Sequence, residues 1–325
     1  MRSVLIIFFS LWWVSGQSQS SCAGQAVYPL NVNEATALLR TTGNYWYDGF
    51  DPGHYVPNNE SPQKATIFAG GLWMGGKDAA GNLKLSAVTF GVGSNSPYQP
   101  GPLNFNDGQP FPDGCQNWDR FFVVTALELQ QHLDDLNDNG QIDGPVPPSI
   151  LGWPGRGNPW FEGTNGFALP NTPQRLAPFF DGDGDGIYDP QAGDYPLIKG
   201  DRYVWWVYND VDQSGEGMGM EVQCAAYGFN STDEALRYAT FYEHTLIYRG
   251  EEPLDSFYTA LWLDPDIGCS IDDYAGCLPD DQVFFFYNGQ EVDDPCNGYP
   301  GFGTEVPVQA IKVLRSPKKN GPNEG

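Results

Sequence analysis

The amino-acid sequence predicts a mainly β protein, with β-sandwich-like antiparallel sheets, long loops rich in glycine and proline, and one short helix. The 325 residues include 40 glycines and 27 prolines, the residue types that form tight turns. Aromatic residues make up 14% of the chain, which suits pleated strands and exceeds what a disordered chain carries. The segments with the strongest strand character are separated by turn clusters at intervals typical of a sandwich or barrel.

The N-terminus has the layout of a secretory signal peptide. Arg2 supplies a positive charge, residues 4–14 are apolar, and small polar residues follow. We take residues 1–20 as the signal peptide, with Gly16 and Ser18 as alternative last residues. The apolar run is shorter than the roughly 20 residues of a membrane-spanning helix, and we expect no transmembrane segment in the mature chain.

The first predicted element of the mature chain is a hairpin. Its strands are Ile67–Met74 and Leu83–Phe90, and turn-forming residues connect them. Residues 71–77 also fit the spacing of a phosphate-binding loop, but Asp78 stands where that loop requires Ser or Thr to bind magnesium. The hairpin is the better interpretation.

The middle of the chain alternates loops with short elements. Residues 91–117 are rich in proline and predict a loop, Trp118–Val124 predicts a strand, and Ala126–Leu133 contains good helix formers without glycine or proline. A polar loop is expected from Asp134, and residues 144–178 predict an irregular segment.

The C-terminal part carries five strong strand signals. They are Tyr203–Tyr208, Met220–Phe229, Leu236–Tyr248, Ser256–Leu263 and Val283–Tyr287. Alternation sends Trp205 and Trp206 to opposite faces, so at least one belongs to the core. We divide the mature chain into an N-terminal β-rich region with calcium loops (21–200) and a β-sandwich-like region (201–325).

The net charge is -25, from 41 acidic and 16 basic residues. Such a charge opposes binding to nucleic acid and anionic lipid. A negative charge attracts cations, but it also keeps a secreted protein soluble. The spacing of the carboxylates must therefore show whether they form a cation-binding site.

Residues 181–189 (DGDGDGIYD) have the spacing of a calcium loop, with acids at positions 1, 3, 5 and 9 and glycine at 6. The predicted ligands are the carboxylates of Asp181, Asp183, Asp185 and Asp189 and the carbonyl of Ile187. Ala192 replaces the bidentate Glu of an EF-hand, and Pro190 opposes a following helix. We therefore predict a calcium loop other than an EF-hand, with Asp194 as an outer ligand.

A second copy of this spacing covers residues 135–143 (DLNDNGQID). Its predicted ligands are Asp135, Asn137, Asn139, Gln141 and Asp143. Asparagine carries less charge than aspartate, so we expect weaker calcium binding here than at Asp181. The alternative is an Asx-rich turn that needs no ion.

Two further acidic segments are interpreted without calcium. Residues 210–215 begin the same pattern, but Met218 occupies position 9, which favours an acidic turn. Four aspartates surround Cys269: Asp264, Asp266, Asp272 and Asp273. They form either another cation site or an acidic loop held by a disulfide, and we favour the loop.

Six cysteines in an exported chain favour disulfides over metal binding. They are Cys22, Cys115, Cys224, Cys269, Cys277 and Cys296. Cys269 and Cys277 are the closest pair in sequence and are predicted to be bonded; the other pairings stay open.

The chain carries no complete catalytic apparatus, and we predict that it is not an enzyme. Its three histidines lie far apart, and neither H-E-x-x-H nor G-x-S-x-G occurs. With so many acids, any chosen pair of glycosidase carboxylates would be arbitrary.

Several stretches resemble large secreted proteins of the Bacteroidetes, which reach the cell surface through a C-terminal type IX secretion sorting domain. They are residues 37–49 (ALLRTTGNYWYDG), 67–87 (IFAGGLWMGGKDAAGNLKLSA), 100–103, 118–125, 181–210 and 263–277, with LDPDIGC and DDYAGC in the last. The sorting domain itself is not in this sequence, so we expect an N-terminal fragment. The resemblance implies display at the outer surface of a Gram-negative bacterium.

These observations predict a secreted, calcium-binding, adhesin-like or structural protein of the cell surface. Surface glycans or other surface proteins are the expected partners. The alternatives are a secreted hydrolase, glycosidase or peptidase, with structural calcium, and a glycan-binding module.

Overall fold

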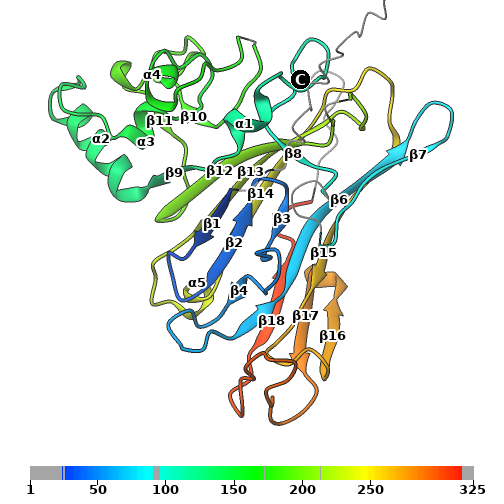
Figure 1. The fold of residues 1–325 in the computed structure, drawn as a ribbon. Helices are drawn as coiled ribbons and strands as arrows, with labels where there is room; N and C mark the ends of the chain where they lie inside the picture. Colours follow the sequence, from blue (N-terminus) through cyan, green and yellow to red (C-terminus); the bar gives the residue numbers. More distant parts are fainter. Residues whose placement is uncertain (1–23, 25, 91–95, 172, 213, 317–325) are drawn as a thin grey trace, which may run out of the picture.

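The computed structural model describes residues 24, 26–90, 96–171, 173–212 and 214–316, and within them the fold is mainly β, as predicted (Figure 1). The predicted signal peptide lies outside these residues. The strands are β1 (Val27–Leu30), β2 (Thr36–Arg40), β3 (Asn44–Tyr45), β4 (His54–Tyr55), β5 (Ala65–Ile67), β6 (Ala69–Lys77), β7 (Leu83–Ser86), β8 (Gln99–Pro100), β9 (Phe122–Thr125), β10 (Phe179–Phe180), β11 (Tyr195–Pro196), β12 (Arg202–Asn209), β13 (Met220–Gly228), β14 (Phe241–Tyr248), β15 (Asp255–Asp264), β16 (Asp273–Leu278), β17 (Val283–Asn288) and β18 (Val308–Lys312). The helices are α1 (Gly114–Trp118), α2 (Ala126–Asn139), α3 (Pro148–Leu151), α4 (Phe161–Asn165) and α5 (Glu234–Arg237), with short 3-10 turns η2 (Pro190–Ala192) and η3 (Pro279–Asp281).

The first sheet has the strand order β15-β6-β3-β2-β4-β5, with β1 added to β2 and β7 added to β6. The predicted hairpin is present as β6 and β7, where Met74 faces Ser86 and Lys77 faces Leu83. Its turn is held by Asp78, whose Oδ1 accepts hydrogen bonds from the backbone N–H groups of Ala80 and Asn82.

The second sheet has the order β14-β13-β12-β8, with β9 paired to β12. β12 and β13 pair antiparallel over their whole length, from Arg202 opposite Gly228 to Asn209 opposite Glu221. Trp205 and Trp206 lie on opposite faces of β12, and both are buried. Both tryptophans therefore belong to the interior.

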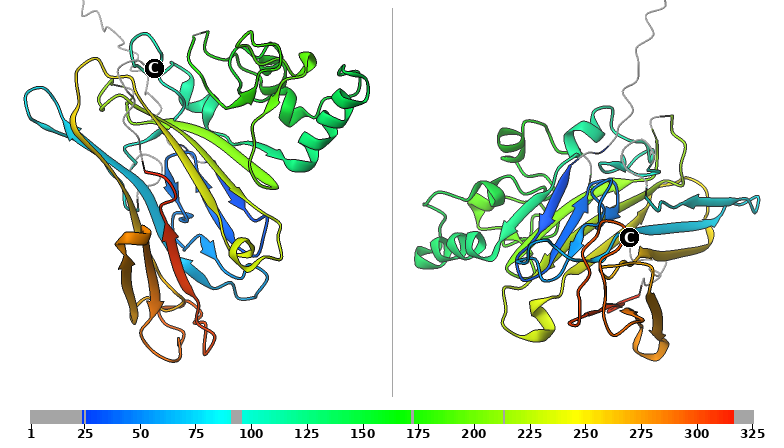
Figure 2. Two further views of the ribbon diagram at one scale, coloured as in Figure 1. Left: turned by 180° about the vertical axis from the view of Figure 1, so that it is seen from behind. Right: turned by 60° about the horizontal axis from the view of Figure 1, so that its bottom comes forward.

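The two faces of the second sheet contact different hydrophobic cores. Val204, Trp206 and Val222 belong to the core shared with the first sheet, which we call the sandwich core. Trp205 and Tyr203 belong to a second core beneath helices α3 and α4 and the loops around them, which we call the insertion core. Figures 1 and 2 show these helices on the side of β12 and β13 that faces away from β1 and β2.

Residues before and after position 200 are interleaved in both sheets. β15 pairs with β6 in the first sheet, and β12 pairs with β8 and β9 in the second. The sequence regions 21–200 and 201–325 therefore share both sheets. A third sheet of β16, β17 and β18 lies at one end (Figure 2), where Gln309 accepts a hydrogen bond from Thr66 Oγ1 at 2.7 Å.

Four predicted boundaries were wrong. In the hairpin, the second strand ends at Ser86 and not at Phe90. The strand expected from Trp118 begins only at Phe122, because residues 114–118 form α1. The strand expected from Leu236 begins at Phe241, because Asp233 caps the short helix α5.

The fourth wrong boundary is the end of α2, which continues to Asn139 and not to Leu133. Thr125 and Glu128 form a capping box at its start, and Gly140 ends it with φ of +82°. A positive φ favours glycine, and no glycine or proline stands before it to stop the helix.

The predicted Cys269–Cys277 disulfide was also wrong, because Cys269 is bonded to Cys296, with a Cα–Cα distance of 5.2 Å. Cys277 lies in β16, exposed and unbonded, opposite Phe284 of β17. Pairing within β16 and β17 holds Cys277 in the third sheet. Cys115 is disulfide-bonded as well, whereas Cys224 is buried and unbonded.

Replacing Cys269 and Cys296 together by serine should lower the free energy of unfolding by about 3 kcal/mol, because the bond closes a loop of 27 residues in the unfolded chain. Urea denaturation of the full chain measures this change. Cys277→Ser is the matched control and should leave stability unchanged. A non-reducing peptide map that joins Cys269 to Cys277 would contradict the assignment.

Candidate metal centre

The loop that contains the first predicted calcium motif connects β10 to β11. Phe180 pairs with Tyr195 across this two-stranded sheet, and their rings stack with centroids 4.7 Å apart. Residues 181–194 therefore leave and re-enter the same short ladder, and their backbone is closed into a compact loop.

The structure brings together the carboxylates of Asp181, Asp183 and Asp185. Each offers an oxygen, and the three oxygens lie within 4.8 Å of one another. Two oxygens that bind one calcium ion at 2.3 to 2.6 Å are separated by at most about 5 Å. The spacing of the three carboxylates therefore suits a single calcium ion.

Backbone amides fix the orientation of these carboxylates. Asp181 accepts hydrogen bonds from Gly184 N (2.8 Å) and Gly186 N (2.9 Å), and Asp185 accepts one from Ile187 N (2.6 Å). Gly184 and Gly186 both have φ near +77°, a backbone conformation that favours glycine. The alternating glycines thus allow the chain to coil around the carboxylates.

Asp189 and Asp194 have other roles in this loop. Asp189 Oδ1 accepts hydrogen bonds from Trp160 Nε1 and Gln191 N, both at 3.0 Å, and so caps η2. Asp194 is buried, and its two oxygens accept hydrogen bonds from Gly182 N and Asp189 N. Burial raises the pKa of Asp194, and the charges of Asp181 and Asp183 raise it further.

The second predicted loop, residues 135–143, is divided between a helix and a turn. Asp135, Asn137 and Asn139 lie in α2, where each residue rotates by about 100°, so Asn137 points away from the other two. Asp135 accepts from Gly144 N at 3.1 Å, and Asn139 donates to Asp143 at 3.0 Å. The structure therefore does not gather these side chains around one point.

The two motifs are nevertheless neighbours. His132 of α2 donates from Nε2 to the carbonyl of Asp194 at 3.0 Å, and Leu136 lies against Gly193. The sequence did not predict this contact, because nothing in the pattern of this polar helix distinguishes His132 from its exposed neighbours. It is the one buried residue of α2.

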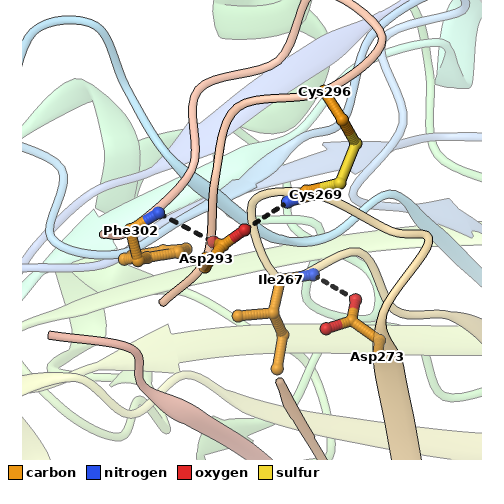
Figure 3. The surroundings of a disulfide bond; sticks show 6 residues. All are labelled: Ile267, Cys269, Asp273, Asp293, Cys296 and Phe302. Carbon is orange, nitrogen blue, oxygen red and sulfur yellow. Dashed lines mark hydrogen bonds between the residues drawn. A yellow bond between two sulfur atoms is a disulfide. The ribbon is translucent and has the colours of Figure 1, made fainter. Parts of the chain in front are cut away.

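The aspartates near Cys269 form a second acidic cluster, held by the disulfide (Figure 3). Asp293 is fully buried and accepts hydrogen bonds from Cys269 N at 3.1 Å and Phe302 N at 2.7 Å. Asp273 accepts one from Ile267 N at 2.8 Å. The sulfur of Cys269 lies near Asp272 and Asp293, but a sulfur in a disulfide is no thiolate and offers no strong metal ligand.

Burial, with a smaller contribution from charge repulsion, raises the pKa of aspartates in this cluster. Burial raises the pKa of Asp266 to about 6, and Asp264 and Asp273 contribute. The pKa of Asp273 is also raised to about 6, chiefly by burial. One carboxylate oxygen each of Asp272 and Asp273 is buried without a hydrogen-bond partner among the described residues.

His132 lies in α2, whereas His54 and His244 pack against the neighbouring rings of Trp46 and Tyr45. His54 Nδ1 lies 2.7 Å from Thr66 Oγ1, and His244 Nε2 lies 2.5 Å from the Tyr45 hydroxyl. Burial lowers the pKa of both to about 4. Both are therefore neutral at pH 7, and each serves local packing.

Comparisons of the chain with protein-family models, with curated proteins and with solved structures gave no significant match. Within the described residues, every helix is too short or too polar to cross a membrane.

Protonation of Asp266 should stabilise the protein. Its pKa is about 6 in the folded state and ordinarily 3.8, so the folded state gains stability as pH falls from about 6 to about 4. Asp266→Asn should therefore raise the melting temperature at pH 7.5, and the gain should shrink at pH 4.5. Differential scanning calorimetry at both pH values measures it.

Asp280→Asn is the matched control for this measurement, since Asp280 is exposed at the start of the loop before β17. It should change the melting temperature little at either pH. A destabilisation by Asp266→Asn that is equal at pH 7.5 and 4.5 would contradict the assignment.

Proposed function

We propose that the chain is a secreted, calcium-binding structural or adhesin-like protein of the bacterial cell surface. The observation that carries the proposal is the convergence of the Asp181, Asp183 and Asp185 carboxylates within 4.8 Å. Repulsion among the three carboxylates would be relieved by a bound cation, although Asp183 and Asp185 are exposed and water also screens them. The predicted signal peptide and the resemblance to large secreted surface proteins support the location.

Calcium would act structurally at this loop. Three carboxylates supply hard oxygen ligands, and water and backbone carbonyls would complete the six to eight that the ion requires. The loop joins β10 to β11, and Tyr188 within it is fully buried in the insertion core, where its hydroxyl donates to the Ile150 carbonyl at 2.8 Å. Ion binding would therefore stabilise the packing of the insertion against the second sheet.

The expected calcium affinity of the Asp181 loop also suits an extracellular location. Because this loop has no bidentate Glu at position 12, we expect weaker binding than in an EF-hand, with a Kd of roughly 0.1 to 1 mM as in extracellular modules. Calcium at millimolar concentration outside the cell would fill it.

The test is thermal unfolding of the full chain in EDTA and across a calcium titration. Calcium should raise the melting temperature, with a stabilisation of about 2.7 kcal/mol once its concentration is a hundredfold above Kd. The double variant Asp181→Asn, Asp183→Asn should lose most of this response. At position 183 asparagine keeps the oxygen that accepts from Asp185 N, whereas at position 181 it keeps only one of the two oxygens that accept from Gly184 N and Gly186 N. The melting temperature of the variant in EDTA therefore serves as its own baseline.

The matched control is Asp107→Asn combined with Asp280→Asn, which removes two exposed charges elsewhere. This control should keep the full calcium response, and magnesium should not replace calcium in the unmodified protein. A calcium response that survives in the Asp181, Asp183 variant, or no response at 10 mM calcium, would refute the proposed site.

A further inference from the structure

A cavity of about 290 Å³ lies between the loop after β3 and the loops held by the Cys269–Cys296 disulfide. Three aspartates line it, Asp48, Asp51 and Asp266, together with the aromatic side chains of Tyr55, Phe68 and Tyr299. It is separate from the Asp181 loop.

The lining has an ordered arrangement. Its floor consists of the buried residues Pro52, Ala65 and Gly268, whereas Asp48 and Asp51 are exposed at its rim. The aromatic rings are half-buried between floor and rim, and Phe68 contacts Tyr299 edge-to-face with centroids 6.4 Å apart. A ligand would therefore meet aromatic walls below a negatively charged rim.

The walls are fixed before any ligand arrives. Gly268 N donates to the Ala65 carbonyl at 3.0 Å, which attaches the 264–268 loop to β5. The disulfide ties this loop to the segment that carries Tyr299, and Tyr299 donates to Asp51 at 3.3 Å. A preformed site loses little conformational entropy on binding.

The charge of the lining is only partly compensated. No Lys, Arg or His is among the described residues that line the cavity. Arg40 donates to the backbone carbonyls of Tyr47 and Asp48, and its charge acts on the Asp48 carboxylate. Asp266 is half-buried and has neither a hydrogen-bond nor an ion-pair partner in the described structure, and its raised pKa reflects this.

The charged groups of the lining are all acceptors. The carboxylates can only accept, and the hydroxyls of Tyr55 and Tyr299 already donate to Pro52 and Asp51. The Gln63 amide is the one other side-chain donor among the described lining residues, and it donates to the Asn58 carbonyl at 3.4 Å. Sugars need donors as well as acceptors, whereas guanidinium and ammonium groups donate and never accept. The cavity therefore matches an organic cation better than a saccharide.

The geometry also argues against a metal ion. The three carboxylates are not among the groups of acids in the described structure whose oxygens converge within 4.8 Å. A flat, weakly hydrated guanidinium can stack on aromatic rings and reach separated carboxylates at the same time.

We propose that this cavity binds the guanidinium group of an arginine side chain presented by a partner protein. Asp51 and Asp266 accept its N–H groups, and its plane stacks on the ring of Phe68. The ring of Tyr299 is perpendicular to that of Phe68 and therefore borders the edge of the guanidinium. This site goes beyond the calcium loop and does not depend on it.

The test is isothermal titration calorimetry of the full chain, in 2 mM calcium and 50 mM salt, with the capped peptide Gly-Gly-Arg-Gly-Gly. The citrulline peptide, which has the same shape without charge, should bind at least about tenfold more weakly. The affinity of the lysine peptide should lie between those of the arginine and citrulline peptides. Free agmatine should compete if the guanidinium alone is recognised.

Variants locate the binding. Asp51→Asn and Asp266→Asn should each weaken binding of the arginine peptide by about tenfold, since each removes a charged hydrogen-bond acceptor. Phe68→Leu should weaken it severalfold by removing the ring. Asp280→Asn, which removes a charge elsewhere, should bind as the unmodified protein does, and thermal unfolding establishes that each variant is folded.

Four results would overturn the proposal. The first is no heat of binding at millimolar arginine peptide, and the second is a citrulline peptide that binds as tightly as the arginine peptide. The third is a loss of affinity in Asp280→Asn as large as in Asp51→Asn. The fourth is competition by neutral oligosaccharides that is abolished by Asp51→Asn. The last would make the cavity a saccharide site.

Discussion

The pairing of β12 with β13 is the interaction on which the rest of the structure depends. Tyr203 faces Tyr227 and Trp206 faces Cys224 across this ladder, and both faces of the two strands are buried. One face supports the sandwich core and the other the insertion core. A break in this ladder would disconnect the first sheet from the insertion that carries the Asp181 loop.

The second constraint is the large number of carboxylates, some of which the fold must bury. Backbone amides, more than basic side chains, hold the buried aspartates. Asp210 accepts from the amides of Met218, Gly219 and Met220 at the turn between β12 and β13, and Asp293 accepts from Cys269 and Phe302. Such bonds organise turns, but they leave the negative charge in place.

That remaining charge unites the two proposals. Where carboxylates converge within the reach of one ion, as at Asp181, a hard divalent cation fits. Where they are spread around aromatic rings, as at Asp51 and Asp266, a larger organic cation fits. The spacing of the acids, and not their number, separates the two kinds of site.

The sequence alone was sufficient for features governed by local spacing. It predicted the mainly β class, the hairpin of β6 and β7, and the opposite faces of Trp205 and Trp206. Of the acids in the 181–189 loop, Asp181, Asp183 and Asp185 converge, whereas Asp189 caps η2. Turn residues, hydrophobic alternation and glycine placement determine structure over a few residues, so the local sequence pattern is enough to predict these features. The end of α2 was predicted wrongly at Leu133, because the polar residues from Asp134 were interpreted as a loop although the first glycine is Gly140.

Only the tertiary structure decided what depends on contacts between distant segments. The cysteine nearest in sequence was not the partner of Cys269, because pairing of β16 with β17 keeps Cys277 in the third sheet while the chain returns Cys296 to the loop. The burial of His132 against Asp194 and the assembly of Asp51, Asp266 and Tyr299 around one cavity arise from the same cause. Residues far apart in the chain meet only when the sheets pack, and no local pattern records which of them will face each other.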